Sequence, residues 1–352
     1  MGRKRVLIFG VTGQDGFYLT KLLLEKDYVV YGVARRTSTP NTNNIKPFLG
    51  YSNFQLISGD VTDAFSVYNI LESIHPDECY NLAAMSQVGT SFNQPSLTTD
   101  VVYRGVLNIL EAIRLVHLKD RIGSNFIKLY QASSSEMFGS SSQGESSIHG
   151  RYQNEDTSFS PNSPYAVAKL AAHHLVRVYR HSYGVFGSCG ILMNHESPLR
   201  SEEFVTRKIT KYVANLYQAI QYGIIIPRLK LGNIESYRDW MHAEDAVRGM
   251  YLIMQQDKPD DYVLASGETH SIKEFLAVAF GLIGIKDWQD HIEIDAQLYR
   301  PNEVPYLRGR ADKAKRVLGW EPKISFDQLV YDMVSSDVAN LGLKLESSKG
   351  VS

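Results

Sequence analysis

Tyr165 and Lys169 form a Tyr-x-x-x-Lys pair whose side chains could transfer a proton. In a chain with 21 tyrosines this spacing arises about once by chance, so the pair gains meaning from its position. Pro164 fits the start of a helix, and residues four apart on a helix share one face. An ammonium beside a phenol favours the phenolate, so we expect the pKa of Tyr165 to lie below its usual value of about 10. Tyr165 would then act as a base toward a hydroxyl group whose carbon loses hydride.

Ser134 and Glu136 follow a strand predicted at Phe126–Gln131. Ligands of open parallel sheets bind beyond the carboxyl ends of the strands, so this segment is well placed for chemistry. In an extended chain both side chains project to the same side. A carboxylate beside a Tyr/Lys pair indicates a second proton transfer, such as removal of a proton next to a new ketone. From these residues alone, a helix-capping or surface carboxylate explains Glu136 equally well.

A glycine-rich turn, Gly10-Val-Thr-Gly13-Gln-Asp-Gly16, follows the first predicted strand and precedes a helical pattern. Glycines allow the backbone to turn tightly and to approach a pyrophosphate, which then sits on the N–H groups of the helix. The turn therefore predicts a dinucleotide site in contact with Gly10, Gly13 and Gly16. A purely structural tight turn is the alternative interpretation.

The second predicted strand, Val29–Ala34, ends in Arg35 and Arg36 rather than in an acidic residue. An acid there would hold the 2′-hydroxyl of NAD, whereas two guanidiniums suit a 2′-phosphate. We therefore expect NADP as the cofactor, with two solvated surface arginines as the alternative. Further cofactor contacts are expected after the third and fourth strands, at Asp60, Val61, Leu82, Ala84 and Ser86.

Short apolar runs alternate with amphipathic stretches through the first half of the chain, which is typical of βαβ units. The predicted strands are Arg5–Phe9, Val29–Ala34, Gln55–Ser58, Glu78–Leu82, Phe126–Gln131 and Gly187–Leu192. The predicted helices between them are Phe17–Lys26, Ala64–Ile74, Thr98–Val116 and Pro164–Tyr183. This order predicts an α/β fold with a doubly wound parallel Rossmann sheet.

The second half is less regular and predicts a smaller C-terminal α/β substrate lobe. We expect residues 1–192 to form mainly the NADP-binding domain and residues 193–340 mainly the substrate-binding lobe, with interleaved segments. Residues 341–352 are expected to be a frayed tail. The stretch 139–164 is rich in Ser, Gly, Asn and Pro, which predicts a long loop, and we expect it to act as a lid.

Composition argues against several classes of protein. The net charge is −1 without any charge run, so neither nucleic acid nor an anionic membrane is an expected partner. No stretch approaches the roughly 18–20 apolar residues of a membrane span, and the apolar run Val6–Phe9 is too short for a signal peptide. Cys79 and Cys189 lie in apolar runs, which predicts reduced, buried thiols in a cytoplasmic protein. No metal site is predicted.

Longer strings add a more specific signal. The most specific are Asn194-His-Glu-Ser-Pro198 and Phe204-Val-Thr-Arg-Lys-Ile-Thr210. Shorter ones are the glycine-rich turn, Arg35-Arg36, Tyr130-Gln-Ala-Ser133, Ser163-Pro-Tyr-Ala166, Leu231-Gly-Asn233, Arg238-Asp-Trp240, Gly267-Glu-Thr-His270, Arg300-Pro-x-Glu303 and Leu318-Gly-Trp320. Together they resemble the GDP-mannose 4,6-dehydratase family of extended short-chain dehydrogenases/reductases, over about residues 4–338.

This resemblance implies a role for each matching residue. It implies catalysis by Ser134, Glu136, Tyr165 and Lys169, with Ser134 in the place of the usual threonine. It implies that the cofactor contacts also include Thr12, Gln14, Asp15, Lys169, His195 and Arg200. It implies that the GDP-sugar is held by Asn194, Glu196, Lys208, Arg238, Arg300 and Glu303.

The implied reaction is the redox-neutral dehydration of a GDP-hexose, GDP-mannose, to a GDP-4-keto-6-deoxy-hexose. NADP takes hydride from C4 and returns it at C6, while Glu136 removes the proton at C5 and helps to expel the C6 hydroxyl as water. The family also implies a homo-oligomer whose subunits pair through helices at Thr98–Val116 and Pro164–Tyr183.

Several positions depart from the family pattern. Ser134 lacks the threonine methyl group, which leaves its χ1 less restricted. Asn44 replaces an arginine of a loop that helps to form tetramers, so both a dimer and a tetramer stay open. Met85, Gln87 and Leu97 replace a glutamine, a histidine and a cofactor-contacting tyrosine. The first alternative is therefore a GDP-manno-heptose 4,6-dehydratase, followed by a sugar-nucleotide 4-epimerase and a catalytically inactive NADP-binding regulator.

The strand-end arginines generate the first testable prediction. Loss of one phosphate–arginine contact costs about 1.5–3 kcal/mol, so Arg35→Ala should weaken NADP binding by roughly 10- to 150-fold and change NAD binding little. Titration of each cofactor into wild type and variant measures the ratio of the two affinities. An unchanged NADP/NAD ratio would remove Arg35 from the cofactor site.

Overall fold

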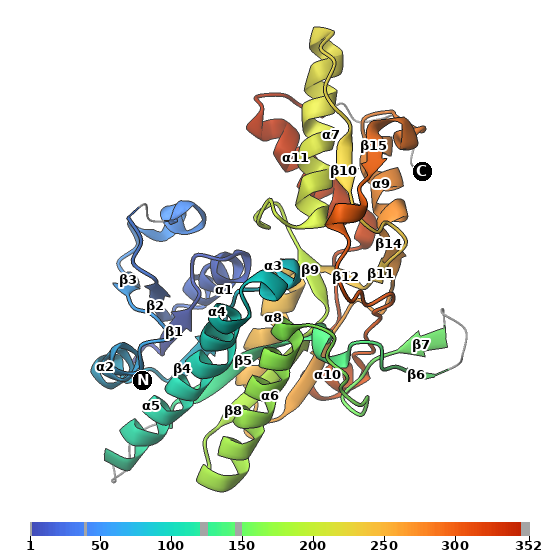
Figure 1. Ribbon diagram of the computed structural model, residues 1–352. Helices are drawn as coiled ribbons and strands as arrows, with labels where there is room; N and C mark the ends of the chain where they lie inside the picture. The colour runs from blue at the N-terminus through green and yellow to red at the C-terminus, as the bar shows by residue number, and fades with distance from the viewer. Residues whose placement is uncertain (1, 39–40, 120–125, 145–149, 346–352) are drawn as a thin grey trace.

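The computed structural model describes residues 2–38, 41–119, 126–144 and 150–345 (Figure 1). A seven-stranded sheet forms its centre, with the order β13-β8-β5-β4-β1-β2-β3, and neighbouring strands are parallel throughout. Its strands are β1 (Arg5–Phe9), β2 (Val29–Ala34), β3 (Phe54–Ser58), β4 (Glu78–Asn81), β5 (Lys128–Ser134), β8 (Gly187–Leu192) and β13 (Asp261–Leu264). The predicted doubly wound α/β Rossmann sheet is confirmed.

Both faces of the sheet are buried, which explains why its strands read as nearly continuous apolar runs. Along β1, Val6 and Ile8 enter the core on one face, and Leu7 and Phe9 enter the core on the other. The first face is covered by α1 (Gln14–Glu25) and α8 (Ala243–Met254). The second face is covered by α2 (Ala64–Ile74), α5 (Gly105–Lys119) and α6 (Pro164–Tyr183).

The predicted helix Thr98–Val116 is not one regular helix. A short helix, α4 (Pro95–Thr99), leads into a π-helical turn (Asp100–Arg104), and α5 follows directly. A π-helical turn inserts an extra residue into the helical repeat and often marks a functional site. Here Val101, within that turn, lines the cavity that is described below.

The C-terminal lobe has an apolar core of its own. It is built from α7 (Val205–Tyr222), α9 (Ile272–Gly281), α11 (Phe326–Asn340) and the parallel pair β10 (Leu229–Leu231) and β15 (Ile292–Ile294). Figure 1 shows these elements together, with α7 and α11 side by side. Leu341, Leu343 and Leu345 pack against this core, so the first part of the expected tail is packed rather than frayed. Residues 346–352 of that tail lie outside the described residues.

The chain crosses between sheet and lobe more than once. After β8, β9 (Asn194–Glu196) pairs with β12 (Trp240–His242), and the chain then returns to the sheet through α8 and β13. These crossings bring residues 194–208 and 300–303 to the carboxyl ends of the strands. Residues that are far apart in the sequence therefore meet at one edge of the sheet.

The loop at 139–164 does not lie where a lid would lie. Its described part carries a two-stranded hairpin, β6 (Gln143–Gly144) and β7 (Arg151–Tyr152), which points away from the sheet in Figure 1. The buried Gln153 bonds through its backbone to the segment 308–310. None of the described residues of this loop lines the cavity below. In the described residues, 139–144 and 150–164, these contacts hold the chain to one side of the cavity, which argues against the expected lid. Residues 145–149 lie outside the described residues.

Two further expectations concern buried side chains and helices. Cys79 and Cys189 are both buried and unpaired, as predicted. Within the described ranges, no helix is both long enough and apolar enough to cross a lipid bilayer.

Candidate active site

A cavity of about 1010 Å³ opens at the carboxyl ends of the sheet strands, where the C-terminal lobe meets the sheet. Each residue that the sequence analysis assigned to catalysis, cofactor or substrate lines it, with the exception of Arg36. The catalytic candidates Ser134, Glu136, Tyr165 and Lys169 all belong to this lining. The fold thus gathers groups from both halves of the chain into one site.

The glycine-rich turn has the geometry that a close backbone approach requires. Gly10 adopts a φ of 82°, and a Cβ there would lie 2.8 Å from the backbone nitrogen of Ala83. Gly13 precedes the first turn of α1, and its N–H donates to the Gly10 carbonyl oxygen over 3.1 Å. A Cβ at Gly16 would lie 2.2 Å from the Val11 carbonyl oxygen. Gly10 and Gly16 therefore tolerate no side chain, and the start of α1 stays open to an anionic ligand.

The turn after β1 lies beside the turn after β4. The strands β2 and β3 lie on one side of β1 and β4 lies on the other, so the chain changes direction across the sheet at this point. Such a switch point is where open α/β sheets bind their ligands. Leu82, Ala84 and Ser86 line the cavity on the β4 side, and Asp60 and Val61 line it on the β3 side.

The two strand-end arginines differ in position. Both are exposed, but Arg35 lines the cavity and Arg36 does not. Side chains alternate in direction along an extended chain, which accounts for the difference between neighbours. A cofactor contact of Arg36 stays a prediction.

The N-terminus of α6 is fixed by a capping residue and a proline. The Ser163 hydroxyl accepts a hydrogen bond from the Ala166 N–H over 3.1 Å, and Pro164 occupies the first helical position. Because this cap fixes where the helix begins, it also fixes which residues face the sheet. Tyr165 and Lys169 both lie on the buried face, as their spacing predicted.

The expected lowering of the Tyr165 pKa is wrong for this structure. Burial raises the pKa of the Tyr165 hydroxyl, and its hydrogen bond with Ser134 offsets only part of that effect. Burial also lowers the pKa of Lys169 to about 8. The Lys169 Nζ lies 5.7 Å from the centroid of the Tyr165 ring and donates to the Ala132 carbonyl oxygen over 2.7 Å. The ammonium is thus directed at a carbonyl, and the loss of water around the phenol outweighs its attraction.

Glu136 is not a surface carboxylate, because it is only 9% exposed. It does not supply the cap of its own turn either, since the Ser134 hydroxyl accepts a hydrogen bond from the Glu136 N–H over 3.2 Å. The Glu136 Oε1 lies 3.8 Å from the Arg300 Nη1. The Glu303 carboxylate lies 3.5 Å from the same Arg300 nitrogen and 2.7 Å from the Arg238 Nη2. Two carboxylates and two guanidiniums therefore share one side of the cavity.

Comparison with known proteins assigns this arrangement to a family. The family model described as GDP-mannose 4,6 dehydratase matches residues 7–333. The chain belongs to the GDP-mannose 4,6-dehydratase family. GDP-mannose 4,6 dehydratase 1 of Arabidopsis thaliana is 47% identical over 342 residues, which cover 96% of this chain and 90% of that protein. GDP-mannose 4,6-dehydratase of Vibrio cholerae is 40% identical over 367 residues, covering 96% and 94%.

Solved structures of more distant proteins share the fold. The dTDP-glucose 4,6-dehydratase DesIV from Streptomyces venezuelae, with NAD and TYD bound, aligns with a TM-score of 0.81 over 96% of this chain and 98% of that chain. Its sequence identity is 22%, so the likeness concerns the fold.

In this dehydratase-family chain, Asp15 and His195 join the glycine-rich turn to β9. The His195 Nε2 lies 2.8 Å from the Asp15 carboxylate, and its Nδ1 lies 2.9 Å from the Met193 carbonyl oxygen. Both partners only accept hydrogen bonds, so His195 donates from both nitrogens and is positively charged. Burial alone would lower the pKa of His195, but the Asp15 carboxylate raises it. Burial alone would raise the pKa of Asp15, but His195 lowers it.

Glu196, expected at the GDP-sugar, is 2% exposed and makes protein contacts. Its Oε2 accepts a hydrogen bond from the Thr206 hydroxyl over 2.8 Å and lies 3.0 Å from the Arg200 Nε. The Arg200 guanidinium lies 3.5 Å from the centroid of the Phe204 ring. These contacts favour Glu196 as the group that orients Arg200, and a contact of Glu196 with substrate stays a prediction.

Sequence reasoning missed Ser133 and His173. Ser133 lines the cavity, and its hydroxyl lies 3.0 Å from the His173 Nδ1. His173 follows Tyr165 and Lys169 at the same four-residue spacing, and all three side chains are buried. The four-residue helical spacing is therefore the sequence signal that could have identified His173.

The Asp15–His195 pair generates a pH-dependent prediction. The stability that His195 gains from the pair is fully present below a pH of about 6.5 and is lost as the pH rises through the raised pKa of His195. The stability that Asp15 gains from the pair is fully present above a pH of about 3.8 and is lost as the pH falls through the lowered pKa of Asp15. Asp15→Asn should therefore reduce the free energy of unfolding by about 2–3 kcal/mol near pH 6 and by less near pH 9.

Urea denaturation of wild type and Asp15→Asn at both pH values measures this difference. Lys21→Met, a change at an exposed cation on α1, serves as the control and should show no such pH dependence. An equal loss for Asp15→Asn at pH 6 and pH 9 would mean that His195 is uncharged in the folded protein.

Proposed function

We propose that this protein dehydrates GDP-mannose to the GDP-4-keto-6-deoxy-hexose, with NADP as a bound cofactor. The observation that carries this proposal is the carboxylate of Glu136 in the same cavity as Tyr165, Lys169 and Ser134. A Tyr/Lys pair suffices to oxidise an alcohol, whereas elimination of water needs a further acid/base. Membership in the GDP-mannose 4,6-dehydratase family supports the same reaction.

The residues of the cavity fit a nicotinamide dinucleotide. Gly10 and Gly16 leave no space for side chains where the turn meets α1, which suits a pyrophosphate at the helix start. NADP rather than NAD is supported by Arg35 at the position where an NAD site carries an acid. When bound, the oxidised nicotinamide would supply a reversible hydride acceptor for the oxidation at C4 and the reduction at C6.

At C4, Tyr165 removes the proton of the sugar hydroxyl as that carbon is oxidised. Ser134 shares a hydrogen bond with Tyr165 and can hold the same hydroxyl, so it orients the substrate for this transfer. Burial raises the pKa of Tyr165, so the phenolate needs a positive charge nearby. The Lys169 ammonium lies beside the Tyr165 ring and supplies part of this positive charge.

At C5 and C6, Glu136 moves the second proton. The ketone at C4 acidifies the C5–H, Glu136 removes this proton, and the same carboxyl group protonates the C6 hydroxyl as it leaves as water. When C6 is then reduced, C5 takes a proton from Tyr165, which gained one from the C4 hydroxyl in the first step. Arg300, 3.8 Å away, orients the carboxylate for both transfers. We assign the diphosphate of GDP to the cationic side of the cavity, at Lys208, Arg238 and Arg300, since guanidiniums bind phosphate through paired hydrogen bonds.

A GDP-manno-heptose is the second candidate substrate. It carries an extra carbon at C6, and three departures from the family pattern, Met85, Gln87 and Ser134, line the cavity. Mass spectrometry of the products from GDP-mannose and GDP-manno-heptose, with kcat/KM for each, decides between the two.

We also infer a cytoplasmic location, which is supported by two unpaired, buried cysteines.

A homodimer through α5 and α6 is the proposed assembly. These helices pack against each other and carry exposed apolar side chains, namely Leu115, Leu118, Val167, Val178 and Tyr183. Sedimentation at micromolar concentration should give a species heavier than the 39.7 kDa monomer, and Val167→Glu combined with Val178→Glu should shift it toward the monomer. A monomeric wild type would overturn the dimer. The Asn44 side chain donates to the Thr12 carbonyl oxygen of its own chain.

The Glu136 assignment generates a prediction for the reaction itself. Glu136→Gln should still bind NADP and GDP-mannose but should lose dehydration by roughly 10²- to 10⁴-fold, because a positioned acid/base contributes that much. In heavy water the wild type should place one solvent deuterium at C5, and hydride from C4 should appear at C6 of the same molecule. NADPH should not accumulate.

Two outcomes would contradict this mechanism. Steady, stoichiometric release of NADPH would make the protein a dehydrogenase. Full dehydratase activity of Glu136→Gln would remove Glu136 from the reaction. Glu235→Gln, at an exposed carboxylate outside the cavity lining, is the matched control and should keep wild-type rates.

A further inference from the structure

His173 lies one helical step beyond the proposed catalytic pair. Tyr165, Lys169 and His173 are separated by four residues each, and all three side chains are buried on the face of α6 that meets β5. Each of them contacts the end of that strand. Lys169 donates to the Ala132 carbonyl oxygen over 2.7 Å, and the His173 Nδ1 lies 3.0 Å from the Ser133 hydroxyl.

A third contact joins α6 to the end of β5. Tyr165 is hydrogen-bonded to Ser134, the next residue of the strand. Three consecutive strand residues, 132–134, thus meet three side chains from successive turns of α6. Tyr165 and Lys169 line the cavity, whereas His173 lies outside its lining.

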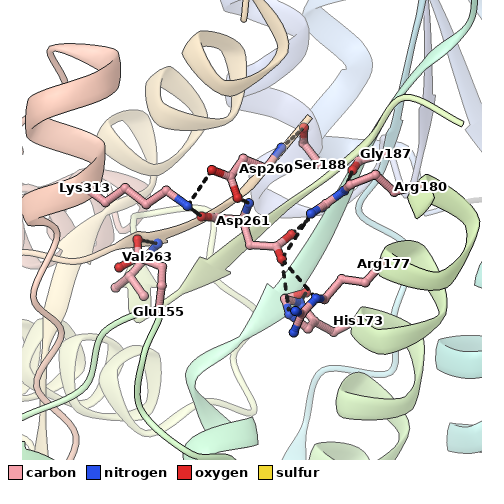
Figure 2. A network of polar contacts seen from close by, with 11 residues as sticks. Glu155, His173, Arg177, Arg180, Gly187, Ser188, Asp260, Asp261, Val263 and Lys313 are labelled. Atoms are coloured by element: carbon pink, nitrogen blue, oxygen red, sulfur yellow. Dashed lines mark hydrogen bonds and ion pairs between the residues drawn. The ribbon is translucent and has the colours of Figure 1, made fainter. Parts of the chain in front are cut away.

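The other ring nitrogen of His173 faces Asp261 of β13. Figure 2 shows His173, Arg177 and Arg180 of α6 converging on the Asp261 carboxylate. The Arg180 Nη2 lies 2.5 Å from Asp261, and the Arg177 Nε and the His173 Nε2 each lie 3.8 Å from it. Arg180 also donates to the Gly187 carbonyl oxygen over 2.8 Å, so this carboxylate is held firmly between α6 and the sheet.

These contacts determine the hydrogen-bonding state of His173. The groups facing it are Ser133, Cys189, Asp261, Arg177, Arg180 and His174. Burial lowers the pKa of His173 to about 4, so the ring is neutral at neutral pH. Burial alone would raise the pKa of Asp261, but Arg180 lowers it, so the carboxylate is ionised. The Asp261 carboxylate, 3.8 Å from Nε2, favours the tautomer with its hydrogen on Nε2 by electrostatic attraction. In that tautomer Nδ1 accepts the hydrogen of the Ser133 hydroxyl.

The cluster of His173, Cys189 and Asp261 could also suggest a metal site, since its ligand atoms lie within 4.8 Å of one another. Arg180 already occupies the Asp261 carboxylate, and Arg177 adds a second positive charge. Two guanidiniums beside the carboxylate disfavour a cation there. The orientation of the neutral ring toward Ser133 is the better explanation of the cluster.

We propose that His173, oriented by Asp261, is a positioning residue for the dehydration. By accepting the Ser133 hydrogen bond it holds the end of β5, which carries Ser134 and Glu136, in register with Tyr165 on α6. This inference rests on the proposed function for its kinetic consequences. A shift of the reacting groups by a fraction of an ångström would slow the chemical step and leave binding of both ligands intact.

Variant kinetics test the proposal. His173→Leu should lower kcat on the order of 10- to 100-fold, with KM for GDP-mannose and the affinity for NADP within about twofold of wild type. His173→Asn places an amide oxygen near the position of Nδ1 and should restore most of kcat. His174→Leu, at the exposed neighbour, should match wild type.

Ser133→Ala breaks the same bond from the other side. It should resemble His173→Leu, and the double variant should be no slower than either single variant, because both remove one interaction. If His173→Leu does not fold, the comparison of Ser133→Ala with His173→Asn takes its place. Wild-type kcat in His173→Leu or in Ser133→Ala, or additive losses in the double variant, would overturn the proposal.

A measurement without substrate separates this inference from the proposed function. Nitrogen NMR of labelled histidine should show His173 neutral with Nδ1 unprotonated, and Ser133→Ala should shift that Nδ1 resonance. An unmoved resonance, or a proton on Nδ1, contradicts the role of His173. Failure of the wild type to dehydrate GDP-mannose, with the NMR result as expected, contradicts the proposed function alone.

Discussion

The carboxyl end of β5 meets the buried face of α6 through polar contacts, and the geometry of the whole cavity depends on that meeting. Lys169 donates to the Ala132 carbonyl oxygen, and Tyr165 bonds to Ser134. A buried polar group without a partner costs about 1–3 kcal/mol, and a charged one costs more. The helix cannot slide along the strand without such losses, so Tyr165 on the helix, the proposed base, and Glu136 after the strand, the proposed acid/base, keep one relative position.

Burial also sets the electrostatic character of the site. It makes the Tyr165 phenol harder to ionise and brings the pKa of Lys169 down to about 8. In this structure, Tyr165 is therefore protonated at neutral pH. The same loss of water strengthens the Asp15–His195 pair, because a buried charge keeps its ionised form only beside a partner.

The partners of the buried charges come from distant parts of the chain. Asp15 in the glycine-rich turn meets His195 on β9, and Glu136 after β5 meets Arg300 near the C-terminus. Both contacts arise because the chain leaves the sheet after β8 and returns to it through β13. The parallel sheet places all strand ends at one edge, and the crossings bring the C-terminal cations to that edge.

Local signals in the sequence were enough for the elements and for much of the site. Apolar runs located six of the seven sheet strands, and the chain adds the seventh, β13, on its return from the C-terminal lobe. Ser163 and Pro164 marked the start of α6, and the spacing of Gly10 and Gly16 indicated a ligand turn, since these signals depend on neighbours along the chain. Only the tertiary structure decided that Tyr165 is harder to ionise than usual and that His173 bonds to Ser133. It also left the described residues of 139–164 outside the cavity lining and placed Glu136 beside Arg300. The pKa of a buried group depends on how much water the surrounding chain excludes, which no local pattern encodes. The contacts His173–Ser133 and Glu136–Arg300 join segments that are far apart in the sequence, so no local pattern encodes them either.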